Sequence, residues 1–144
     1  MLKYFIPLVM ILLIGLTASC SGSSPAETNV NLGQQFNLKF AQTASINGEP
    51  LMIKFSQLVS DSRCPTGAVC VWEGEVSCLL DITYQNVLNQ KIITKSGSST
   101  DLASSDFDAY IILFDVQPYP EVDKQIKDED YSLKLIIKHS GEEG

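Results

Sequence analysis

The residues best suited to chemistry lie together in one stretch, Asp61–Gly74. Two cysteines in it, Cys64 and Cys70, enclose a Pro-Thr-Gly segment that favours a tight turn. We predict that they form a disulfide, which closes a ring of seven residues. A Cys-x-x-Cys redox motif needs a closer spacing, and the single histidine, His139, is too distant in sequence to suggest a zinc site. The pattern therefore predicts a structural disulfide and no metal.

Arg63 stands directly before this ring and allows two interpretations. In the first, its side chain reaches back to Asp61 or to a backbone carbonyl and fixes the ring in place. In the second, it points outward from a rigid loop as a recognition residue, an arrangement that protease inhibitors use because rigidity lowers the entropy cost of binding. Our candidate binding residues are Asp61, Arg63, Thr66 and Glu73.

Paired carboxylates provide a second chemical possibility. Glu73 and Glu75 point to the same side of an extended strand, about 7 Å apart, and Asp61 precedes them. Two carboxyl groups at such a distance suit glycoside hydrolysis. Outward-facing glutamates more often serve solubility, and His139 alone does not indicate a Ser-His-Asp site. We predict no catalytic residues and no cofactor, with a carboxylate-based envelope hydrolase as the alternative.

Acidic side chains also gather in two other segments. Calcium binds such oxygens, but neither segment has the spacing of an EF-hand, and lysines interrupt the second. We interpret both as solvated acidic loops. The net charge of −7 disfavours nucleic acid and anionic lipid surfaces as partners. The acidic residues in question are Asp101, Asp106 and Asp108, followed by Asp123, Asp128, Glu129 and Asp130.

The segment Cys70–Tyr84 alternates apolar and polar residues, which predicts one long strand with a single buried face. On that face we expect Trp72 to fill the core, Gly74 to accommodate tight backbone, and Cys78 to be a buried, unreactive thiol. A disulfide from Cys78 to either ring cysteine, or a redox role, remains open. The whole predicted face is Cys70, Trp72, Gly74, Val76, Cys78, Leu80, Ile82 and Tyr84.

Further strands are predicted by the same alternation, and no segment shows a helical stripe. Asn47-Gly48 is a strong hairpin signal, and Gln117-Pro-Tyr-Pro120 ends a strand. We predict an all-β fold: one antiparallel, immunoglobulin-like β-sandwich of about six or seven strands, with a small β-barrel as the alternative. The predicted strands centre on residues 36–40, 51–56, 70–84, 87–94, 110–116 and 131–138.

The first residues have the order of a secretory signal: one charge, an apolar run, then small residues before Cys20. We predict a lipoprotein signal peptide over 1–19 with lipid on Cys20; ordinary cleaved secretion and an uncleaved anchor are the alternatives. A flexible tether over 20–31, one domain over 32–139 and a disordered tail over 140–144 complete the predicted organisation. In each case the domain lies outside the cytoplasm.

The Asp61–Gly74 motif resembles one in a family of small secreted or lipid-anchored bacterial proteins. These share Asp-Ser-Arg-Cys-Pro, a few further residues and Cys-x-Trp-x-Gly, and the likeness extends over residues 33–138. Glu73 departs from the family, in which a small residue is common at that place. The resemblance implies an extracytoplasmic β domain and no assigned activity.

Together these features predict a binding or interaction module of the cell envelope, anchored to the membrane by lipid on Cys20. We expect a monomer that contacts an envelope protein, and no nucleic acid. A protease inhibitor that uses the disulfide-braced loop, and the hydrolase above, are the rival functions.

Overall fold

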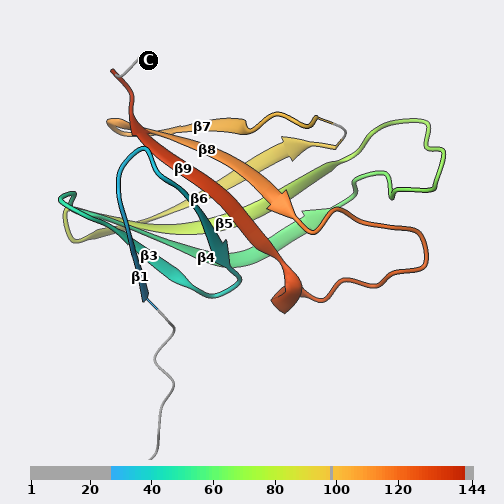
Figure 1. The fold of residues 1–144 in the computed structure, drawn as a ribbon, viewed down its shortest axis with the longest axis horizontal. Helices are drawn as coiled ribbons and strands as arrows, with labels where there is room; N and C mark the ends of the chain where they lie inside the picture. The colour runs from blue at the N-terminus through green and yellow to red at the C-terminus, as the bar shows by residue number, and fades with distance from the viewer. Residues whose placement is uncertain (1–26, 98, 142–144) are drawn as a thin grey trace, which may run out of the picture.

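Two packed β-sheets make up the computed structural model, which describes residues 27–97 and 99–141 (Figure 1). The first sheet has five strands in the order β1-β3-β4-β5-β6, and the second has four in the order β2-β9-β8-β7. The sheets do not close into a barrel, so the sandwich prediction is confirmed. The elements are β1 (Glu27–Val30), β2 (Gln35–Lys39), β3 (Thr43–Ile46), β4 (Leu51–Asp61), β5 (Glu75–Tyr84), β6 (Val87–Ser96), β7 (Ala103–Phe107), β8 (Tyr110–Gln117), the 3-10 turn η1 (Asp128–Asp130) and β9 (Ser132–His139).

The structure has more strands than the six or seven we predicted. The three missed strands, β1, β3 and β7, are each four or five residues long, which is too short for the alternation of apolar and polar residues to be recognised. β1 occupies part of the segment predicted to be a tether, and it pairs in parallel with β3. The sandwich is therefore not purely antiparallel. The hairpin at Asn47-Gly48 is present and joins β3 to β4.

The core lies between the sheets and follows the predicted alternation. On β5, Val76, Cys78, Leu80 and Ile82 are fully buried, and they face apolar residues of the second sheet. Cys78 is a free thiol, and burial raises its pKa to about 12. It therefore stays protonated at neutral pH and acts as a small apolar side chain. The facing side chains on β8 and β9 are Ile112, Phe114, Val116, Leu133, Leu135 and Ile137.

β5 begins later than predicted, and this changes the place of Trp72. The strand starts at Glu75, and the residues from Cys64 to Glu73 form a loop outside the sheet. Trp72 is 63% exposed, so the prediction that it fills the core is wrong. Gly74 provides the physical reason: its φ of +69° turns the chain between the loop and the strand, which breaks the alternation at that point.

No helix within 27–97 and 99–141 is long and apolar enough to cross a membrane. The predicted signal peptide over 1–19 and Cys20 lie outside the described residues, as do the last three residues of the predicted tail.

Candidate functional site

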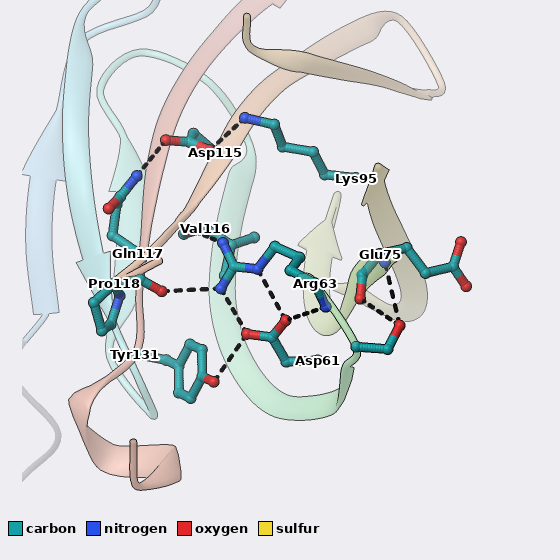
Figure 2. Close-up of polar contacts among 10 residues, drawn as sticks. Asp61, Arg63, Glu75, Lys95, Asp115, Val116, Gln117, Pro118 and Tyr131 are labelled. Atoms are coloured by element: carbon teal, nitrogen blue, oxygen red, sulfur yellow. Dashed lines mark hydrogen bonds and ion pairs between the residues drawn. The ribbon is translucent and has the colours of Figure 1, made fainter. Parts of the chain in front are cut away.

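Arg63 lies at the base of the loop and is buried, with 5% of its surface exposed. Its Nε and Nη2 atoms donate to the two carboxylate oxygens of Asp61, at 2.9 and 2.6 Å. Nη1 donates to the carbonyl of Val116 at 2.8 Å, and Nη2 also donates to the carbonyl of Pro118 at 2.9 Å (Figure 2). One side chain thus joins the end of β4 to the end of β8. This is the first of the two interpretations of Arg63, in which it fixes the loop.

Tyr119 and Tyr131 complete the surroundings of this ion pair. The Arg63 guanidinium lies 4.9 Å from the centre of the Tyr119 ring, a favourable cation–π distance. The hydroxyl of Tyr131 donates to Asp61 Oδ2 at 3.0 Å (Figure 2), and burial followed by this bond raises the pKa of Tyr131 to about 12. The Asp61 carboxylate and the Arg63 guanidinium therefore both have partners within the protein. Their role is to hold this end of the sandwich together.

Asp61 makes stability depend on pH. Burial alone would raise the pKa of its carboxyl, but hydrogen bonds from the Arg63 side chain and backbone outweigh burial and hold the pKa below its ordinary value. A carboxyl whose pKa is lowered in the folded state stabilises the fold at pH values above its pKa in the unfolded chain, which is about 4. This contribution is lost as the pH falls towards the lowered pKa of the folded state. We expect urea denaturation at a series of pH values to show stability falling below about pH 4, with a shallower fall in the Asp61→Asn protein. Equal slopes in both proteins would contradict this role of Asp61.

Two glycines allow the backbone segments at the base of the loop to touch. A Cβ at Gly74 would lie 1.9 Å from the carbonyl oxygen of Ser62, and one at Gly97 would lie 2.0 Å from that of Glu73. Backbone hydrogen bonds fill the same region: Cys64 N donates to Glu73 O at 3.0 Å, and Gly97 N donates to Gly74 O at 2.8 Å. The prediction that Gly74 accommodates tight backbone is therefore correct.

The loop itself is fixed at two further places. Cys64 and Cys70 form the predicted disulfide. Thr66 donates its N–H to Pro120 O at 2.9 Å and accepts from Val122 N at 3.1 Å, so the loop is bound to the segment that follows β8. Thr66 was a candidate binding residue; its backbone joins these two loops, and its side chain is exposed.

Three apolar side chains project from this fixed loop into solvent. Val69 and Val71 are fully exposed, and Trp72 is exposed for nearly two thirds of its surface. We call these three residues the apolar tip. Val122, in the segment after β8, is also exposed. It lies beside Gly67, which precedes Val69 by two residues in the chain. Single exposed apolar residues are common on protein surfaces, whereas several on one short loop are unusual.

The sequence held a signal for the apolar tip that the alternation concealed. Val71 and Trp72 are neighbours, so in an extended strand they would point to opposite faces and only one of them could enter the core. Assigning the whole segment to one strand placed Trp72 inside and left Val71 without explanation.

The carboxylates predicted as a possible hydrolytic group do not converge. Asp61 faces Arg63, whereas the side chain of Glu75 points away from both (Figure 2). Glu73 and Glu75 are exposed. His139 lies at the opposite end of β8, where it stacks on Tyr110 and contacts Glu49 at 3.2 Å. His139 is thus partly buried and paired.

Metal-ligating side chains do not cluster in 27–97 or 99–141: no group of three or more His, Cys, Asp or Glu is arranged to hold an ion. The acidic segment before β9 contains the turn η1 and local ion pairs of Lys124 with Glu121 and of Lys127 with Glu129. Asp106, assigned to a loop, lies within β7.

Compared with known proteins, the chain matches no family model, no curated protein sequence and no solved structure.

Proposed function

We propose that this protein is an extracytoplasmic binding module that recognises a protein partner through the apolar tip. The observation that carries the proposal is the combination of Val69, Val71 and Trp72 in solvent with a loop that is fixed at its base. Three apolar side chains exposed to water disfavour solubility. A partner that covers them would remove this apolar surface from water, which is favourable in free energy.

The rigidity of the loop supports this function physically. A loop that is already ordered loses little conformational entropy on binding, so more of the contact energy appears as affinity. The disulfide closes the loop on itself, the Arg63 hydrogen bonds hold its base to β8, and the backbone hydrogen bonds of Thr66 join it to the segment after β8. Tryptophan is also the residue type most enriched among side chains that dominate binding energy.

The proposed location rests on the signal-like N-terminus with Cys20 and on the disulfide, which persists in oxidising compartments. We propose a lipid anchor at Cys20. In Figure 1 the loop from Cys64 to Glu73, coloured green, extends at the right end of the molecule, whereas β1 begins in the left half. An anchor that precedes β1 would leave the apolar tip accessible to a partner.

The rival functions have less support from the geometry. An inhibitor that inserts Arg63 into a protease needs that side chain free, but Arg63 is buried in bonds to Asp61, Val116 and Pro118. A hydrolase needs a carboxyl that can be protonated near neutral pH, whereas Arg63 holds the pKa of Asp61 low. We therefore favour binding.

Replacing Trp72 with alanine is the direct test of this proposal. We expect the Trp72→Ala protein to retain its stability within about 0.5 kcal/mol, because the side chain is largely exposed. We expect its affinity for the partner to fall by about 30-fold or more, the loss typical of a central aromatic contact. The measurement compares the amounts of one envelope protein retained by immobilised wild-type and variant protein over a concentration series.

The matched control is Leu88→Ala on β6, because Leu88 is 61% exposed, nearly the same as Trp72. It should retain the partner as the wild type does. Equal retention by all three proteins would refute a role for the apolar tip.

A further inference from the structure

Lys95 occupies an unusual place for a lysine, since it is 95% buried between the two sheets. It belongs to β6, at the edge of the first sheet, and its ammonium group contacts Asp115 on β8 of the second sheet at 2.5 Å. Gln117 Nε2 donates to the other oxygen of Asp115 at 2.6 Å. Figure 2 shows the three side chains in a row, beside Arg63.

This row lines a pocket of about 390 Å³, a volume within the range of small-molecule sites. The segment after β6 contributes the hydroxyl side chains of Ser99 and Thr100, and the segment after β8 contributes Tyr119. Arg63 packs over the Tyr119 ring and so fixes its position. The pocket therefore has polar groups on both sides and one aromatic ring in its wall.

The polar groups of the pocket retain hydrogen-bonding capacity. A lysine ammonium has three N–H donors, and among residues 27–97 and 99–141 that of Lys95 makes one side-chain hydrogen bond, to Asp115. Burial would raise the pKa of Asp115, but the bonds from Lys95 and Gln117 outweigh it and keep the pKa low, so the carboxylate is ionised and accepts hydrogen bonds. Donors and acceptors thus stand side by side.

Charge balance selects the class of ligand. Lys95 is paired with Asp115, and Arg63 is paired with Asp61, which does not itself line the pocket, so each cation of the lining already has a carboxylate partner. An anionic ligand would meet the Asp115 carboxylate, and a cationic one would meet the Lys95 ammonium. A neutral hydroxyl avoids both conflicts, because it can accept from Lys95 and donate to Asp115 at once.

We propose that this pocket binds a neutral sugar. Adjacent sugar hydroxyls match the alternating donors and acceptors of Lys95, Asp115 and Gln117, and the C–H face of a sugar ring suits an aromatic wall such as Tyr119. This site is separate from the apolar tip and would give the module a second ligand.

Saturation-transfer NMR on the full chain tests the proposal with glucose, galactose, mannose and N-acetylglucosamine as neutral probes. Glucuronate and glucosamine serve as the anionic and cationic probes. We expect transfer to at least one neutral sugar, weaker transfer to its charged counterparts, and an affinity about three- to tenfold lower in the Gln117→Ala protein, which lacks one hydrogen-bonding side chain. Gln117 is exposed, so this variant should fold normally.

The matched control is Gln125→Ala, which removes the same side-chain type from an exposed position outside the pocket. It should bind as the wild type does. Absence of transfer to all four neutral sugars, preference for a charged probe, or unchanged affinity in Gln117→Ala would each overturn the assignment.

Discussion

Replacing Arg63 with methionine is expected to lower the free energy of unfolding by about 3–5 kcal/mol. The change leaves the Asp61 carboxylate without its cation in a site where the side chain is only 8% exposed. It also removes the donors to the carbonyls of Val116 and Pro118. An unpaired buried charge costs more than the lost bonds themselves, so this loss is a large fraction of the stability of an ordinary domain. Urea denaturation monitored by circular dichroism measures it.

The exposed ion pair of Lys124 with Glu121 provides the control. Both side chains are at least half exposed, so Lys124→Met should change stability by less than about 1 kcal/mol. If the free energy of unfolding falls by a similar amount in both variants, Arg63 is not the residue that joins β4 to β8. The loop would then be fixed by its disulfide and its backbone hydrogen bonds alone.

Replacing Gly74 with alanine is expected to cost about 4 kcal/mol or more. The new Cβ would lie 1.9 Å from Ser62 O and 2.9 Å from Arg63 Cα, so the backbone of the loop base must move apart. That movement would disturb the bonds of Arg63 as well as the positive φ of +69°. Thermal and urea unfolding should both show the loss.

Gly33→Ala separates the clash from the effect of φ. Gly33 has a φ of +76°, and a Cβ there meets nothing within 4 Å. Its replacement should cost only the left-handed backbone penalty of about 1–2 kcal/mol. Equal losses at Gly33 and Gly74 would mean that the loop base tolerates separation and is not closely packed.

Much of the fold could be predicted because three of its longer strands bury every second residue along most of their length. In β5, β8 and β9 every second residue is buried, and burial on one face leaves a period of two in the sequence. The short strands β1 and β7 could not be predicted in this way, since their pairing depends on neighbours that the folded sheets bring to them.

The candidate site was predictable where it is local. Cys64 and Cys70 are close in sequence, and Asp61 lies two residues before Arg63, so the disulfide and the ion pair follow from spacing. The carbonyls that accept from Arg63 belong to residues more than fifty positions later. Their approach depends on the order of strands, which alternation does not specify. Lys95 was hidden for the same reason, because its partner Asp115 lies on the other sheet.

Site-specific photo-crosslinking in the producing cells tests the central claim most directly, namely that the apolar tip contacts a protein partner. A benzophenone amino acid replaces Val71 in one protein and Leu88 in another; both positions are exposed, but only the first belongs to the tip. We predict one discrete protein adduct from position 71 that disappears in the Trp72→Ala background, and no corresponding adduct from position 88. The same adducts from both positions, or an adduct at 71 that is indifferent to Trp72, would contradict the account.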